Sequence, residues 1–231
     1  MNILQKFGKI MNGMFKEDIF SRNLGGKQVI FAYNPQHVGD TLLVITDNDQ
    51  AMEQTVERKD NVARIQTEDG RVIGWNFFHI SESLTIEGNG QVTLSDEQVA
   101  TLNQLMTAAG FTEQLTPDHE PKFVVGFVKT CEPHEDSDHL SVTEIEVDNG
   151  QTLQIVCGAP NIRKGLKVVV AKPGAMMPDG LLIWPGELRG VESFGMVCSA
   201  KELHLEGAPT KRGILELGND AVVGEAFKVG K

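Results

Sequence analysis

The chain has 231 residues, enough for two compact domains that each bury their own core. Hydrophobic residues make up 40% and charged residues 23%, as in ordinary globular proteins, and no apolar run approaches the roughly 20 residues of a membrane helix. The net charge is −11, and the three cysteines form no C-x-x-C pair, which argues against a disulfide framework or a zinc ribbon. We therefore expect a two-domain cytoplasmic protein with no membrane segment.

Residues 1–27 are predicted to form an N-terminal arm. Ile3, Phe7, Ile10 and Met14 recur at helical spacing, but glycines in the same stretch weaken the prediction of a helix. Lysines interrupt any apolar core of a signal peptide. We therefore expect no export signal here.

Residues 28–115 are predicted to form a small α+β domain. Apolar and β-branched residues mark strands at residues 29–33, 41–46, 62–67 and 71–80. The Asp69-Gly70 pair predicts a hairpin between the last two, because glycine supplies the positive φ of a tight turn.

The clearest predicted helix runs from Ser95 to Gly110. Ser95 and Gln98 fit a capping box, and Gly110 is the residue type that favours the left-handed position just beyond a helix. Apolar residues recur on one face, at Val99, Leu102, Leu105, Met106 and Ala109. This helix supplies the α component of the α+β domain.

Residues 116–121, with two prolines among polar residues, are predicted to be a linker. Beyond it, residues 122–231 are almost entirely strand-like, with Asn149-Gly150 as the strongest hairpin signal and one short helical piece near Ala200 to Leu205. Five or so short strands in this length favour a closed Greek-key barrel of the OB type. The whole chain is therefore expected to be mainly β, an OB-fold barrel preceded by a small α+β domain.

Basic residues are concentrated in the C-terminal part. Between Pro160 and Arg212 there are eight basic and five acidic residues, a net charge of +3 within a chain of −11. A positive face on an acidic protein is typical of a protein that binds a polyanion at that face alone, because the rest of its surface repels negative charge. We therefore expect nucleic-acid binding in the C-terminal half.

Four motifs then follow one another in a specific order. They are the E-P-H-x-x-x-D-x-L loop, the C-G-A-P-N turn, the A-x-P-G-A segment and L-R-G-V-x-S-x-G-M-x-C-S. Together they resemble the tRNA-binding domain of the EMAP II-like family over about residues 123–229. That module occurs as stand-alone bacterial tRNA-binding proteins, at the C-terminus of some methionyl-tRNA synthetases and near the start of the phenylalanyl-tRNA synthetase beta subunit.

The resemblance implies an OB barrel that binds tRNA by its structure, with little reading of sequence. It places eight positions at the RNA surface: Asn161, Arg163, Lys172, Arg189, Ser193, Met196, Ser199 and Lys201. The four basic members can contact phosphates, and the asparagine and two serines can reach a ribose 2′-hydroxyl or a base edge. The methionine can present an apolar surface to an unstacked base.

One position departs from the family pattern. The first loop usually carries a basic residue just before its leucine, where this chain has His139, flanked by Glu135, Asp136 and Asp138. This substitution predicts a lower affinity than in the synthetase-linked versions. For residues 28–115 the arrangement resembles two-domain stand-alone members, and the resemblance implies no chemistry for that domain.

Other interpretations of the same residues are less favoured. His134, Asp136, Asp138 and His139 have a spacing open to metal binding, but a polar turn between strands needs such residues in any case. The glycines fit no phosphate-binding loop. We expect no metal and no cofactor.

Catalytic and stacking readings of other side chains are also less favoured. Cys198 and His204 could pair as nucleophile and base, yet no third orienting residue is evident. Trp75, Phe77 and Phe78 could stack on bases, but core packing is the simpler reading in an acidic, apolar neighbourhood. We expect no catalytic residue.

Three functions remain open from the sequence. The leading one is a non-catalytic tRNA-binding protein, whose N-terminal domain tunes partner choice or assembly. The alternatives are a trans-acting hydrolase that edits mischarged tRNA and a protein-interaction module that docks an aminoacyl-tRNA synthetase. Stand-alone family members can also dimerise, and the sequence leaves the oligomeric state of this chain open.

Overall fold

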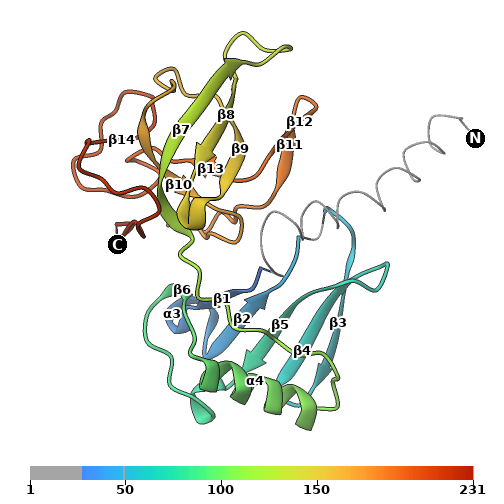
Figure 1. Cartoon of the computed structure of the whole chain (residues 1–231). Coiled ribbons are helices and arrows are strands. Elements are labelled where there is room, and N and C mark those ends of the chain that lie inside the picture. The colour runs from blue at the N-terminus through green and yellow to red at the C-terminus, as the bar shows by residue number, and fades with distance from the viewer. Residues whose placement is uncertain (1–27, 49, 231) are drawn as a thin grey trace, which may run out of the picture.

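The computed structural model describes residues 28–48 and 50–230, so the predicted arm at 1–27 lies outside the described residues. Two six-stranded sheets divide the chain in order (Figure 1): an N-terminal sheet with one long helix, and a C-terminal barrel above it in this view. No helix in the described part of the chain is long and apolar enough to cross a membrane. The mainly β architecture agrees with the expectation.

The N-terminal sheet has six antiparallel strands in the order β3-β4-β5-β2-β1-β6. Its strands are β1 (Ile30–Tyr33), β2 (Thr41–Ile45), β3 (Gln54–Lys59), β4 (Val62–Thr67), β5 (Val72–Phe78) and β6 (Gly90–Val92). Two short helices, α3 (Pro35–Val38) and η1 (Ile80–Glu82), lie between strands. The four predicted strands and the Asp69-Gly70 hairpin are confirmed, whereas β3 and β6, the two edge strands, were not predicted.

Helix α4 (Asp96–Ala108) forms as its caps predict. The Ser95 hydroxyl accepts from the backbone N–H of Gln98, whose side chain accepts in return from the Ser95 N–H. At the other end, Gly110 has φ +79 and donates to Thr107 O, while Phe111 N donates to Met106 O. This is a Schellman motif, so carbonyls left without helical partners are satisfied.

The apolar face of α4 closes the core of the N-terminal sheet. Trp75 and Phe77 are fully buried there, and the Trp75 ring meets Phe111 edge-on with centroids 4.9 Å apart. The packing reading of these two aromatics is therefore confirmed. Phe78 is half-buried and lies under the guanidinium of Arg58, 4.0 Å from its ring centroid.

The barrel strands run in the order β13-β10-β7-β8-β9, and β14 also pairs with β10. They are β7 (Phe123–Pro133), β8 (Ser141–Glu146), β9 (Thr152–Cys157), β10 (Lys167–Ala171), β13 (Met196–Val197) and β14 (Glu216–Leu217), with η2 (Asp148–Gly150) between β8 and β9. Strands β11 (Gly186–Leu188) and β12 (Val191–Ser193) form a separate two-stranded sheet. Strand β7 pairs with β10 through its first half and with β8 through its second, and its register shifts at Val128 to Thr130. One bent strand thus belongs to both sides of the barrel.

Two hydrogen bonds nearly close the barrel between β9 and the end of β12. Phe194 N donates to Gln154 O at 2.8 Å, and Val156 N donates to the hydroxyl of Ser193 at 3.1 Å. The Asn149-Gly150 turn has positive φ at both residues, so the predicted β8–β9 hairpin is confirmed. The barrel is of the expected OB-like type.

Two features of the barrel differ from the sequence prediction. The short helix expected near Ala200 to Leu205 is a turn, in which Leu203 N donates to Ser199 O and Leu205 N to Ala200 O. A two-stranded hairpin of β11 and β12, with Arg189 and Gly190 at its turn, was not predicted. Both segments are too short for periodicity to distinguish them from other conformations.

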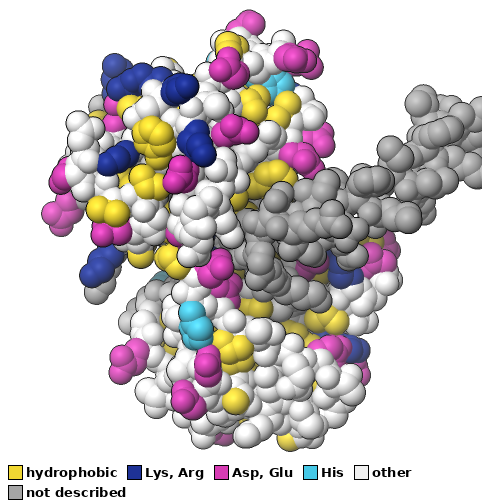
Figure 2. All heavy atoms as spheres, in the orientation of Figure 1, with side chains coloured by type: hydrophobic (Ala, Val, Ile, Leu, Met, Phe, Trp, Pro, Cys, Tyr) yellow, Lys and Arg dark blue, Asp and Glu magenta, His cyan; other side chains and the backbone are white. Residues whose placement is uncertain are grey.

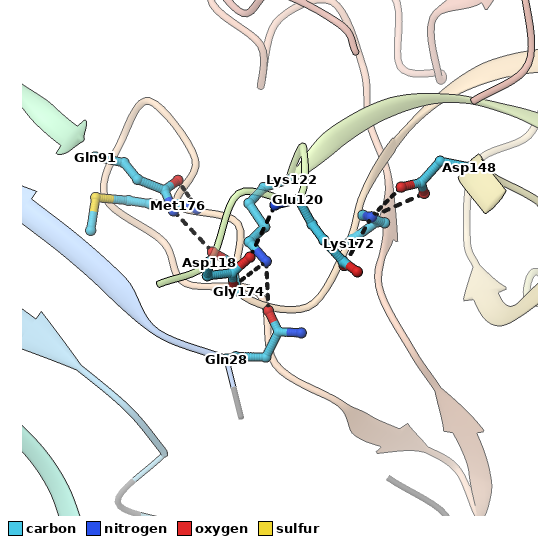
Figure 3. A network of polar contacts seen from close by, with 9 residues as sticks. All are labelled: Gln28, Gln91, Asp118, Glu120, Lys122, Asp148, Lys172, Gly174 and Met176. Carbon is cyan, nitrogen blue, oxygen red and sulfur yellow. Dashed lines mark hydrogen bonds and ion pairs between the residues drawn. The ribbon is translucent and has the colours of Figure 1, made fainter. Parts of the chain in front are cut away.

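Side chains join the N-terminal sheet to the barrel (Figure 3). Lys122 Nζ donates to Gln28 Oε1 at 2.9 Å and to Asp118 at 2.7 Å. On strand β6, Gln91 donates to Gly174 O at 3.0 Å and accepts from Met176 N at 2.9 Å. The junction therefore includes specific polar contacts between residues far apart in the chain.

Candidate nucleic-acid interface

A groove of about 850 Å³ opens on the barrel. Its lining comes mainly from the segment after β9, from β13, from the turn at residues 199–204 and from the loop at residues 209–216. Of the eight predicted positions, it brings together Asn161, Met196, Ser199 and Lys201. This groove is the candidate site.

The floor of the groove is apolar. Val156, Cys157 and Ala200 are buried, and Met196 and Leu215 are half-buried at its surface. The described lining residues include no Phe, Tyr or Trp. The groove can therefore pack against a base or sugar but has no broad aromatic platform for stacking.

The turn at residues 199–204 is closed by its own capping box. Ser199 N donates to Glu202 Oε2 at 2.7 Å, and Glu202 N donates to the Ser199 hydroxyl at 3.2 Å. The Glu202 carboxylate is therefore hydrogen-bonded to the backbone of the turn. The same geometry carries Lys201 outward on the groove rim, where it is exposed.

Glu216, one of three carboxylates in the described lining together with Asp179 and Glu202, is also engaged. It accepts from Asn161 Nδ2 at 2.9 Å and pairs with both terminal nitrogens of Arg163, at 3.0 and 2.8 Å. The hydrogen bonds from Arg163 and then from Asn161 hold the pKa of Glu216 below its ordinary value, and the same pair raises the pKa of Arg163. Arg163 lies beside the groove rather than in its lining.

The cations of the groove have fewer partners than its carboxylates. The side chains of Lys201 and Lys211 are exposed and make no hydrogen bond or ion pair with the described residues. Arg212 makes one contact, from Nη2 to Gly158 O at 3.4 Å. On the face drawn in Figure 2, most Lys and Arg side chains gather over the barrel. Among the described lining residues, Lys201, Lys211 and Arg212 have no carboxylate partner, whereas Glu216 is paired with Arg163.

Lys172 does not lie at this surface, contrary to expectation. Its side chain is buried, with the residue only 4% exposed, and its Nζ donates to both oxygens of Asp148 at 2.9 and 2.8 Å. Glu120 lies 3.6 Å away. A buried ammonium needs such partners, so Lys172 forms an internal ion pair and not the predicted phosphate contact.

Ser193 is likewise buried, and its hydroxyl accepts the barrel-closing hydrogen bond from Val156 N. Its expected surface position is therefore wrong. Asn161 lines the groove but uses its amide internally, donating to Ile214 O and accepting from Ile214 N. Only the tertiary contacts reveal these structural roles.

Arg189 lies away from the groove, at the exposed turn of the β11–β12 hairpin. It donates to Asp136 O at 2.6 Å in the β7–β8 loop. In the same loop, buried His134 accepts from Asp136 N through Nδ1 and donates to Leu188 O through Nε2. Both ring nitrogens of His134 thus serve to hold the loop and hairpin together.

The nucleophile reading of Cys198 has no support from its surroundings. The side chain is fully buried, and burial raises the pKa of its thiol to about 12. Burial also raises the pKa of the Cys157 thiol. Both thiols are therefore protonated at neutral pH, as expected of small core residues.

Two basic residues of the groove, Lys211 and Arg212, were not in the predicted set. They lie in the loop between the last turn and β14, which the four motifs do not include. Their signal in the sequence is a pair of adjacent cations between Pro209-Thr210 and Gly213. The pair is too short to be distinguished from an ordinary solvated loop.

The two halves of the chain match two different protein families. Residues 123–226 match the family described as "Putative tRNA binding domain". Residues 49–118 match a family described as a domain of unknown function. The barrel and the N-terminal sheet therefore match separate families.

Related proteins include one matched over most of this chain and others matched over part of it. The "Putative tRNA-binding protein YtpR" of Bacillus subtilis is 47% identical over 197 residues, covering 85% of this chain and 98% of that protein. The "Phenylalanine--tRNA ligase beta subunit" of Oceanobacillus iheyensis is 61% identical over 83 residues, 36% of this chain but 10% of that subunit. That of Acinetobacter baylyi is 47% identical over 127 residues, 54% of this chain and 16% of that subunit. Because the match to the Bacillus subtilis protein runs over nearly the whole of that relative, the chain belongs to its family, the tRNA-binding proteins of the YtpR type.

Proposed function

We propose that this protein is a non-catalytic, cytoplasmic tRNA-binding protein that grips folded tRNA with the groove of its barrel. The observation that carries the proposal is the charge pattern: Glu202 and Glu216 are engaged internally, while Lys201 and Lys211 keep free ammonium groups. Lining cations that have no carboxylate partner are available for contacts with phosphates. The names of the relatives point to the same ligand.

Within this proposal the predicted residues take different roles. Lys201 contacts phosphate, and Ser199 and Met196 lie beside it for a ribose hydroxyl and a base. Asn161 and Arg163 support the groove through Glu216. Arg189, on the separate hairpin, supplies an outlying contact.

We also propose the division of the chain into residues 28–115, a linker at 116–121 and the RNA-binding part at 122–231. The N-terminal part then tunes assembly or partner choice, and its acidic surface keeps RNA on the barrel. A non-catalytic role is supported by the N-terminal polar groups, which hold one another: Asp40, for example, accepts from Tyr33 and Ser81. The resemblance to synthetase subunits makes an aminoacyl-tRNA synthetase a candidate partner.

The test is a mobility-shift titration with bulk folded tRNA and an unstructured RNA of equal length, at salt concentrations from about 50 to 200 mM. If about four to six phosphates are neutralised, log affinity falls with log salt with a slope of about −3 to −5. Lys201→Ala should reduce that slope by about 1 and weaken all tRNAs alike, as expected for a phosphate contact.

The matched control is Lys129→Ala, which removes one exposed charge from β7 outside the groove lining. Its slope should stay close to that of the wild type. Absence of tRNA binding by the wild type at low salt would refute the proposed function. Equal effects of the two substitutions would instead show that charge acts without regard to position.

A further inference from the structure

The loop at residues 209–215 forms part of the groove and is held in place by hydrogen bonds to Asn161 and Cys198. Ile214 exchanges two hydrogen bonds with the Asn161 side chain, at 3.0 and 2.9 Å, and Leu215 N donates to Cys198 O at 2.9 Å. Gly213 has φ +157, and a Cβ there would come within 2.8 Å of Asn161 Oδ1. The close approach of Asn161 therefore requires glycine at 213.

Anchoring at the base of this loop leaves its two cations facing solvent. Lys211 and Arg212 precede Gly213 directly and are both exposed. The contact of Arg212 with Gly158 O uses one nitrogen of the guanidinium, and most of its donors remain available. Because the loop backbone is held at its base, binding costs less backbone entropy than it would for a loose loop.

The size of the groove limits what can enter it. Its volume of about 850 Å³ lies within the roughly 300–1,000 Å³ typical of sites that take one small molecule. One or two nucleotides match that size, whereas an RNA helix is too wide to enter the groove. The apolar floor at Met196 and Leu215 suits an unstacked base, although without Phe, Tyr or Trp in the described lining the base gains little stacking.

We propose that Lys211 and Arg212 are RNA contacts, and that the groove they share with Lys201 takes one or two unpaired nucleotides of the RNA rather than a helical segment. Phosphates on either side of the unpaired nucleotide meet the cations, and its base or sugar rests on the apolar floor. This inference rests on the proposed function, since it names the part of the RNA that the same groove receives.

The first experiment compares Lys211→Ala/Arg212→Ala with the matched double variant Lys59→Ala/Lys129→Ala, by tRNA titration as above. Both pairs carry the same charge, and the control residues lie outside the groove lining. The groove variant should bind about tenfold more weakly or worse, and its salt slope should fall by about 2. The control should keep the wild-type slope.

The second experiment tests the unpaired nucleotides by competition against labelled tRNA. The competitors are a fully paired RNA duplex and a hairpin with the same stem and an unpaired loop. The wild type should prefer the hairpin, and Lys211→Ala/Arg212→Ala should lose that preference. Circular dichroism of each variant confirms that the fold is retained, as expected for exposed loop residues.

The outcomes separate this inference from the function on which it rests. A wild type that fails to bind tRNA overturns the proposed function. A wild type that binds, with a groove variant equal to the control variant, overturns the role of Lys211 and Arg212. A duplex that competes as well as the hairpin overturns the unpaired nucleotide as the occupant.

Discussion

Lys172 is a charged side chain that is buried and therefore has a structural role. Its ammonium has lost nearly all contact with water and is compensated by both oxygens of Asp148, with Glu120 at the edge of the pair. The backbone N–H of the same residue donates to Lys122 O at 2.8 Å. One residue thus ties β10 to the β8–β9 turn and to the segment that enters the barrel.

We expect Lys172→Ala to lower the free energy of unfolding by about 3–5 kcal/mol, because it leaves the Asp148 carboxylate buried without its partner. Urea denaturation followed by circular dichroism measures the loss. The exposed Lys129→Ala serves as control and should cost about 0–1 kcal/mol.

The RNA affinity of the same variant provides an independent check. Because Lys172 is buried and outside the groove lining, folded Lys172→Ala should keep the salt slope of the wild type. Unchanged stability together with a reduced slope would contradict the internal role of Lys172 and restore it to the RNA surface.

At the scale of elements, the best-determined part of the chain is helix α4. Its start, its end and its apolar face are all specified by local residues, from the capping box at Ser95 to the Schellman motif at Gly110. The helix does not depend on distant contacts for its boundaries. Its packing on the sheet then buries Val99, Leu102 and Met106.

Ser95→Ala should destabilise the protein by about 0.5–2 kcal/mol, since it removes the hydroxyl that accepts from Gln98 N. Thermal or urea unfolding measures this difference. Thr107→Ala, an exposed change within the same helix, should be neutral or slightly stabilising because alanine has the higher helix propensity. If both substitutions had the same effect, the cap would contribute nothing beyond propensity.

The strands that sequence analysis missed share a physical cause. Strand β3 reads QTVERK and lies at the sheet edge, where its exposed side chains show no burial pattern. Strands β6, β11 and β12 have three residues each, too few for alternation to appear. Such strands exist because a neighbouring strand supplies hydrogen-bond partners, and that neighbour cannot be identified from local sequence.

At the scale of the whole molecule, the N-terminal sheet and the barrel meet through side chains that form hydrogen bonds with backbone groups. The side-chain amide of Gln91 donates to Gly174 O and accepts from Met176 N. Close by, Gln28 fills the space beside Gly174, where a Cβ would come within 2.2 Å of Gln28 Oε1. These contacts couple two units that have separate cores.

Gln91→Ala should weaken this coupling by about 1–3 kcal/mol, because it leaves Gly174 O and Met176 N without their partners. The two tryptophans provide a probe in each unit, Trp75 in the N-terminal sheet and Trp184 in the barrel part. Fluorine NMR of fluorotryptophan-labelled protein in urea should show both native signals lost together in the wild type and at separate midpoints in the variant.

The control for this experiment is Gln114→Ala, whose amide bonds stay within the N-terminal unit. Its two midpoints should remain together. Separate midpoints already in the wild type would mean that the junction does not couple unfolding. Coincident midpoints in Gln91→Ala would show that the other junction contacts suffice.

The sequence by itself determined the features that depend on neighbouring residues or on ordered motifs. These are the caps of α4, the turns at Asp69-Gly70 and Asn149-Gly150, the OB-like barrel and the relation to tRNA-binding domains. Tertiary structure alone decided which polar groups reach solvent. It buried Lys172 and Ser193 as structural groups and brought Lys211 and Arg212 beside Lys201, because burial and charge pairing depend on segments that lie far apart in the chain.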